Sequence, residues 1–277
     1  MIAFRSKFFI AILIGLLAPL AAAKAQSRSP NPHTILNDMI SQYDKLSSYE
    51  DSGEIRVVAS ISPIAGGAQV FTIAAISLAD EPLVSFKTYF ASPEMFRFQW
   101  KSSSSRTTRD AVVWRLGKQI FSWKPSPVSP DRFELSGSTN LGLHIDEAIR
   151  ASSGAAFLVP TLLMKEASYD PASAMLRRVT ELSFLREEQF EESLCYVISG
   201  KMSGTPWTLW IDQKTHLLRK TRTSYSAGSF HEKMQGRRGK QFFAEEIHRD
   251  IRFNHKIDDA VFKYRPKIGR KDVDYTH

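Results

Sequence analysis

The chain has 277 residues, enough for one large domain or two small ones, and it carries a formal net charge of +8. This mild basic excess is spread along the chain. It favours loose attraction to anionic lipid headgroups or cell-wall polymers and gives no reason to expect a nucleic-acid partner. The single cysteine, Cys195, excludes an internal disulfide. Because it stands in the apolar run 194–198, we expect a buried structural thiol rather than a reactive one.

The N-terminus has the pattern of a signal peptide covering residues 1–25. Arg5 and Lys7 precede an apolar run that is too short to span a bilayer comfortably. The motif AKA at 23–25 then places small residues at the −3 and −1 positions of a cleavage site. Cleavage would remove three basic residues and lower the net charge from +8 to +5. No cysteine follows the site to carry a lipid, so we predict a periplasmic or secreted protein, with a retained N-terminal anchor as the alternative.

Residues 26–33 are rich in Ser and Pro and predict a flexible tether before the first folded element. Apolar residues at helical spacing then predict a helix over 34–47. From there the hydrophobic period changes to two, which is typical of strands. The strands expected in this half of the chain cover 55–61, 70–76, 84–90, 96–101, 112–116 and 120–123.

The middle of the chain contains a helical insert near 143–165, interrupted by Ser-Ser-Gly at 152–154. Strand patterns then resume, and the strands expected there cover 178–184, 194–199, 205–211, 217–225 and 242–253. The acidic stretch 187–192 predicts a solvated polar linker. Short links favour antiparallel pairing. We therefore predict one α+β domain over 34–277, in which a strongly curved antiparallel sheet forms an unclosed half β-barrel with helices as its plug or lid.

Large apolar side chains alternate with polar ones along several of these strands, so a curled sheet would gather them on its concave face. The residues predicted to form a wall for a hydrophobic ligand are Phe96, Phe98, Trp100, Trp114, Leu116, Trp207, Leu209 and Ile211. Each CH₂ group moved from water into such a space contributes about 0.8 kcal/mol, so an acyl chain could be held without any catalytic group. The alternative, an ordinary filled core, has the same periodicity.

The hairpin 206–220 illustrates the pattern. Trp207, Leu209 and Ile211 are expected on one face and Trp210 on the other. Asp212 is expected to start the turn, because its carboxylate can accept backbone N–H bonds.

No arrangement of residues predicts catalysis, a metal or a cofactor. There is no G-x-S-x-G elbow for a nucleophile. His248, Asp250 and His255 lack the spacing of metal ligands; positions 248 and 250 share a face of a regular strand, whereas 255 does not. The basic loop with Arg237, Arg238 and Lys240 is a candidate contact for anionic headgroups or for a partner, although such loops are often only solvated.

Five motifs in order resemble the LolA-like superfamily, which includes periplasmic lipoprotein carriers and outer-membrane lipoprotein-sorting proteins. The motifs are Tyr43-x-x-Leu46 with Ser48-Tyr49 and Gly53, Phe90-x-x-Pro93-x-x-Phe96-Arg97-Phe98, Val113-Trp114-x-x-Gly117-Lys118, the hairpin LWIDQKTHLLRK and the closing DDAVFKYRPKIG. Together they extend over most of the chain that follows the leader.

The resemblance implies an unclosed antiparallel barrel around an apolar cavity, with helices as a lid. It also implies a non-catalytic monomer that holds a lipid, a lipidated protein or another hydrophobic ligand. Ser92 stands where the carrier has an arginine that helps to hold its lid shut. The alternative function is an envelope sensor or interaction module that regulates a membrane protein. An enzyme acting on an envelope polymer is the least favoured class.

Overall fold

The computed structural model describes residues 29–61, 76–77, 82–91, 94–103, 108–125, 133–138, 140–164, 172–224 and 240–264. The predicted signal peptide, most of the strand predicted over 70–76, and Arg237 and Arg238 lie outside these residues. Lys240 begins the last strand, and its side chain also falls outside the description.

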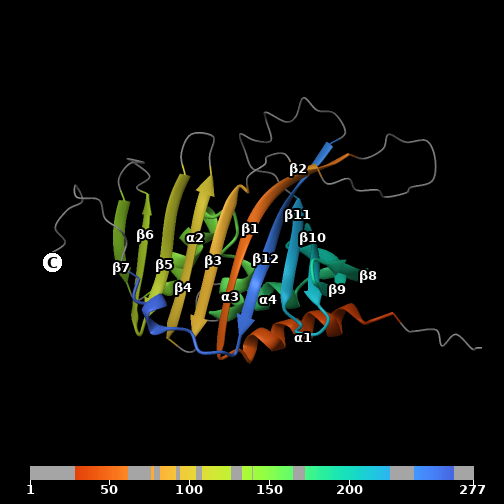
Figure 1. The fold of residues 1–277 in the computed structure, drawn as a ribbon. Coiled ribbons are helices and arrows are strands. Elements are labelled where there is room, and N and C mark those ends of the chain that lie inside the picture. The colour runs from red at the N-terminus through yellow and green to blue at the C-terminus, as the bar shows by residue number, and fades with distance from the viewer. Residues whose placement is uncertain are drawn as a thin grey trace, which may run out of the picture.

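All the strands in the described residues belong to one antiparallel sheet (Figure 1). They are β1 Ser48–Ile61, β2 Ile76–Ser77, β3 Val84–Ala91, β4 Met95–Ser103, β5 Thr108–Leu116, β6 Gln119–Pro125, β7 Phe133–Ser138, β8 Thr180–Phe190, β9 Ser193–Met202, β10 Thr205–Asp212, β11 Leu218–Ser224 and β12 Lys240–Phe253. The order is β7-β6-β5-β4-β3-β1-β12-β11-β10-β9-β8, with β2 paired to β1. Because β7 and β8 are the two ends of this path, the sheet is not closed.

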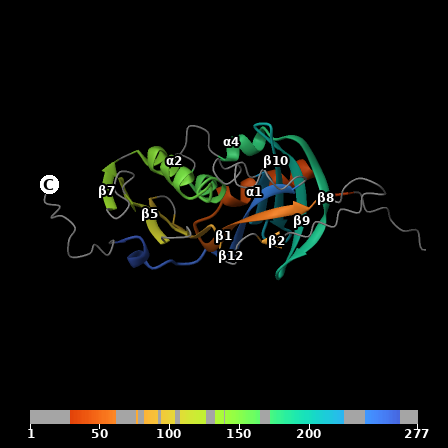
Figure 2. The same ribbon diagram turned by 90° about the horizontal axis from the view of Figure 1, so that it is seen from above.

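The helices are α1 Pro32–Asp44, α2 Leu141–Ala151, α3 Leu158–Leu163 and α4 Ala172–Arg177, with a 3₁₀ turn η1 at Asp259–Val261. Figure 2 shows the sheet curving around α1, α2 and α4, while the segment containing η1 lies on the other face. We call the helix-covered face inner and the opposite face outer. The prediction of an unclosed α+β half-barrel plugged by helices is confirmed. None of the described helices is long and apolar enough to cross a bilayer.

Helix α1 begins two residues earlier than predicted, inside the expected tether. Asn31 caps it by accepting a hydrogen bond from the His33 backbone N–H at 2.9 Å, and Pro32 occupies the first helical position. Proline is favoured there because its missing N–H would have no partner in the first turn. The apolar stripe of α1 is buried against the inner face, including Ile35, Met39 and Tyr43.

The β10–β11 hairpin has the predicted faces. Leu209 and Ile211 lie in the main core, whereas Trp210 packs on the outer face with Cys195. Asp212 starts the turn by accepting the backbone N–H groups of Lys214 and Thr215 at 2.9 and 2.8 Å. Burial alone would raise the pKa of Asp212, but hydrogen bonds from Thr215 and Ser193 and the nearby charge of Arg219 hold it below its usual value. Cys195 is buried, as predicted, and burial raises its pKa to about 12, which disfavours the reactive thiolate.

Two of the predicted wall residues face the wrong way. In the β4–β5 register Phe98 stands opposite Val113, and Trp114 stands opposite Arg97. Val113 therefore faces inward with Phe98, while Trp114 lies outside, where its ring stacks on Phe121. Leu116, two residues on, is 39% exposed. The apolar run at 111–114 has no alternation to reveal its faces, so only pairing with β4 could assign them.

Two other local predictions are corrected. The acidic stretch 187–192 is not a linker as a whole, because Glu187 and Glu188 belong to β8 and only the last two acids form the turn. Glu188 accepts a hydrogen bond from the Trp210 indole at 3.1 Å. Helix α4 lies ahead of the strand predicted to begin at 178 and was not expected.

Gly53 on β1 lies where the Phe86 ring and the backbone of β12 approach it closely. A Cβ atom there would lie against the tip of the Phe86 ring and 2.5 Å from the carbonyl oxygen of Ile247. Since a backbone oxygen cannot move aside cheaply, Gly53→Ala should lower the free energy of unfolding by about 1–3 kcal/mol. Urea unfolding measures it. Gly137→Ala, whose added carbon would meet its nearest neighbour at 3.6 Å, should change stability by less than about 0.5 kcal/mol. Equal effects would refute this packing.

Candidate functional site

The inner face of the half-barrel is largely filled by the protein's own helices. Phe96, Phe98 and Ile211 have no exposed surface and pack in a core shared with α1, α2, α3 and α4. Among the predicted wall residues, Leu209 and Trp100 are almost as buried, and Trp207 is only partly so. The predicted residues that do face inward therefore come together, but most of them belong to the packed core.

An apolar hollow lies on the inner side, and we call it the inner pocket. It has a volume of about 180 Å³. It is lined by Ile55, Ile149, Ser153, Gly154, Phe157, Trp207, Thr221, Thr223, Ala244 and Glu246. Its roof is the link between α2 and α3, and its floor is the strands β1, β10, β11 and β12. The rings of Phe157 and Trp207 meet across it, with centroids 6.1 Å apart.

A buried polar cluster lies next to the inner pocket. The His248 ring bridges two acids: Nδ1 is 2.7 Å from an Asp51 carboxylate oxygen and Nε2 is 3.2 Å from Glu246. Tyr49 donates its hydroxyl to Asp51 at 2.9 Å, and the backbone N–H of Thr88 donates to the other Asp51 oxygen at 3.2 Å. The His248 and Asp51 side chains are fully buried.

The cluster favours the protonated form of His248. Burial opposes protonation, but the hydrogen bond to Asp51 and the nearby charges of Glu246 and Asp51 raise the pKa of His248 to about 9. Burial also raises the pKa of Glu246. A protonated imidazole with both nitrogens facing carboxylates cannot accept a proton at neutral pH, so His248 is unsuited to be a general base. The cluster is better suited to holding β1 against β12.

The sequence pattern offers His248 only as a weak metal candidate and does not predict this cluster. A β-bulge in β12, where Asp250 has φ 52°, breaks the regular alternation. Asp250 therefore binds Ser52 on the outer face, at 2.5 Å, instead of sharing a face with His248. The described residues contain no group of three or more His, Cys, Asp or Glu side chains arranged to hold a metal. One signal was available: Asp51 interrupts an otherwise apolar set of inward positions.

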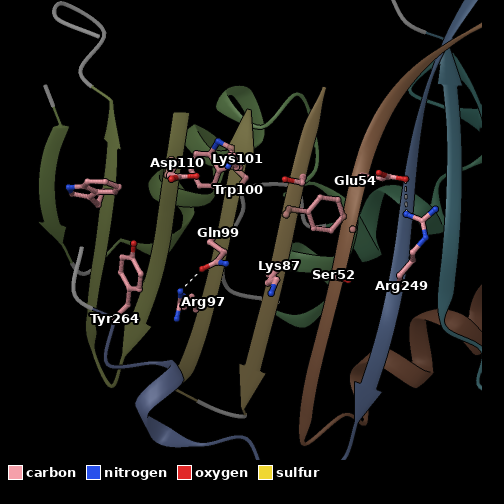
Figure 3. Close-up of a pocket in the computed structure, with 15 residues that line it drawn as sticks. Ser52, Glu54, Lys87, Arg97, Gln99, Trp100, Lys101, Asp110, Arg249 and Tyr264 are labelled. Carbon is pink, nitrogen blue, oxygen red and sulfur yellow. Dashed lines mark hydrogen bonds and ion pairs between the residues drawn. The ribbon is translucent and has the colours of Figure 1, made fainter. Parts of the chain in front are cut away.

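A larger hollow lies on the outer face, and we call it the outer groove (Figure 3). It has a volume of about 660 Å³. It is lined by Ser52, Gly53, Glu54, Ser85, Phe86, Lys87, Arg97, Gln99, Trp100, Lys101, Asp110, Ala111, Trp123, Arg249 and Tyr264. Six strands contribute, and the chain after η1 closes one end with Tyr264. Of the predicted ligand wall, only Trp100 borders it.

Arg97 is the most enclosed cation of the outer groove. Its guanidinium donates to the carbonyl oxygen of Val261 at 2.9 Å and to the amide oxygen of Gln99. It lies over the Tyr264 ring at 4.3 Å and the Tyr89 ring at 5.6 Å. All these partners are neutral, and burial lowers the pKa of Arg97. A cation held in this way has no carboxylate to offset its desolvation.

Comparisons with known proteins give distant structural likenesses only. No family model matches the chain, and no curated protein sequence matches it. The crystal structure of the lipoprotein LppX from Mycobacterium tuberculosis is similar over 83% of this chain and 99% of its own, with 11% identity and a TM-score of 0.42. LprF from Mycobacterium bovis is similar over 83% and 97%, with 11% identity and a TM-score of 0.41.

A LolA superfamily protein from Nitrosomonas europaea is similar over 84% of this chain and 98% of its own, with 11% identity and a TM-score of 0.30. These values describe a similarity in the path of the backbone only. Nothing about ligand, activity or partner follows from them.

Proposed function

We propose that this protein is an exported, non-catalytic binding protein that holds a lipid, the acyl chain of a lipidated protein or another hydrophobic ligand on the inner side of its half-barrel. The observation that carries the proposal is the inner pocket, where the Phe157 and Trp207 rings face each other over an apolar lining. A chain seated there would gain about 0.8 kcal/mol for each buried CH₂ group.

The ligand must displace part of the plug to enter. Small-molecule sites have volumes of roughly 300–1,000 Å³, and the inner pocket, at about 180 Å³, is smaller. The link between α2 and α3 forms the roof of the inner pocket, so it is the segment that an entering ligand would have to displace. Lifting Phe157 off Trp207 would extend the pocket toward the apolar core beneath α3.

Trp207→Ala should weaken the uptake of a neutral fluorescent acyl ester by about tenfold, because it removes a large apolar contact from the pocket wall. Trp207 is only partly buried, so the loss of stability should be small beside that of a core truncation. Fluorescence titration measures the uptake. Trp123→Ala is the matched control, since Trp123 is also partly buried but lines the outer groove. Equal uptake by wild type and Trp207→Ala would refute the proposed pocket.

Native mass spectrometry after gentle purification separates this proposal from the sensor alternative. A co-purifying lipid mass supports a carrier or binding protein. A ligand-free mass together with capture of an envelope membrane protein favours the sensor.

A further inference from the structure

The pairing of strands β3 and β4 places three cations around one neutral side chain on the outer face. Lys87 on β3 stands directly opposite Gln99 on β4. Arg97 and Lys101 lie two residues before and after Gln99, so all three cations share its face of the sheet. Diagonal neighbours across an antiparallel pair are about 7–8 Å apart, within reach of one another through long side chains. Figure 3 shows Lys87, Arg97 and Gln99 together on this face.

The acids of the outer groove do not neutralise this group of cations. Glu54 is engaged by Arg249, with an ion pair of 2.6 Å, and by Arg56 outside the groove. Asp110 stands opposite Lys101 at the edge of the group. Neither Lys87 nor Lys101 has an ion-pair partner within the part of the chain that the structure describes, and both side chains are exposed.

The charged side chains that line the outer groove have a net charge of +2. The three cations are opposed by Asp110 alone, because Glu54 and Arg249 cancel each other. A phosphate monoester carries about −1.5 to −2 at neutral pH and offers three strong acceptor oxygens. Guanidinium and ammonium groups form charge-assisted hydrogen bonds with such oxygens, which are about twice as strong as neutral ones.

The outer groove also has room for more than a bare anion. Its volume of about 660 Å³ lies within the range of small-molecule sites. Ser52 and Ser85 supply short side chains beside Lys87, while Trp123 and Tyr264 form an aromatic end wall. These aromatic rings are placed to contact the organic part of a ligand, while its anionic group lies over Gln99.

We propose that the outer groove is a second binding site, separate from the inner pocket, for a phosphate-bearing organic anion held by Lys87, Arg97 and Lys101. Phosphate esters and phospholipid headgroups share this chemistry. Because the two sites lie on opposite faces of the sheet, this proposal is independent of hydrophobic ligand uptake.

The test uses glycerol 3-phosphate as the probe and isothermal titration calorimetry as the measurement. The double variant Lys87→Gln/Lys101→Gln should weaken binding by at least about tenfold, because two charge-assisted contacts are lost. The matched control is Lys118→Gln/Lys214→Gln, which removes the same charge from exposed turns outside the outer groove. Binding to the control should stay within about twofold of wild type, and uptake of the neutral acyl ester should be unchanged in both variants.

Flotation with vesicles identifies the source of the anion. Binding to phosphatidylglycerol vesicles that is lost in Lys87→Gln/Lys101→Gln supports the site and indicates a headgroup. Binding of soluble glycerol 3-phosphate without flotation supports the site and indicates a free ester. Equal weakening in the control double variant would overturn the proposal, because it would show general attraction to a basic protein. The absence of binding of either probe to the wild-type protein would also overturn it.

Discussion

Replacing His248 with leucine should lower the free energy of unfolding by about 3–5 kcal/mol, because it leaves buried acids without their cation. His248 lies between Asp51 and Glu246, and its ring meets the Phe86 ring edge-on with centroids 5.4 Å apart. Urea unfolding at pH 7 measures the loss. The control is His33→Leu, at an exposed position near the start of α1, which should have an effect below about 0.5 kcal/mol.

The same cluster makes stability depend on pH in a defined window. The pKa of His248 is raised from 6.5 to about 9 in the folded protein. Its contribution is therefore fully present below pH 6.5 and is lost as pH rises through 9. Burial also raises the pKa of Glu246 above 4.5 in the folded protein. Deprotonation of Glu246 therefore lowers the stability of the fold as pH rises above 4.5, in the same direction as the effect of His248. Wild-type stability should fall between pH 6.5 and 9, and His248→Leu should lack most of that slope. If the stability of wild type and of His248→Leu fell equally between pH 6.5 and 9, the assignment of this charge to His248 would be contradicted.

Phe98→Ala should destabilise the protein by about 3–5 kcal/mol, the usual cost of removing a large aromatic ring from a packed core. Phe98 has no exposed surface, and its ring contacts those of Phe86 and Trp100 at centroid distances of 5.9 and 5.5 Å. Urea unfolding measures the change. Phe121→Ala, on the outer face and partly exposed, is the comparison and should cost clearly less. A loss below about 1 kcal/mol for Phe98→Ala would mean that the ring lines open space instead of core.

This result also bears on what the sequence could predict about the inner face. Alternation along β4 correctly placed Phe96, Phe98 and Trp100 together, because a period of two fixes which side chains share a face. It could not tell a cavity wall from a core. That distinction depends on how closely α1, α2 and α3 approach the sheet, and this approach is set by contacts far apart in the sequence.

The errors have the same physical origin. The faces of β5 depend on its register with β4, since the run at 111–114 is apolar throughout. Helix α4 has only six residues, too few for a clear helical period in the sequence. Its buried residues are Ala172 and Leu176. The polar cluster joins Asp51 to His248, which are 197 positions apart in the chain. Only the pairing of β1 with β12 brings these two residues together.

The position of a bound acyl chain is the most direct test of the proposed function. We suggest a crystal structure with a neutral monoacylglycerol that carries bromine atoms along its chain, located by anomalous scattering. The bromine peaks should run from the inner pocket, beside Trp207 and Phe157, toward the core under α3, with the 152–157 link displaced. Peaks confined to the outer face, or a plug that stays closed with no peak inside the half-barrel, would contradict the proposal.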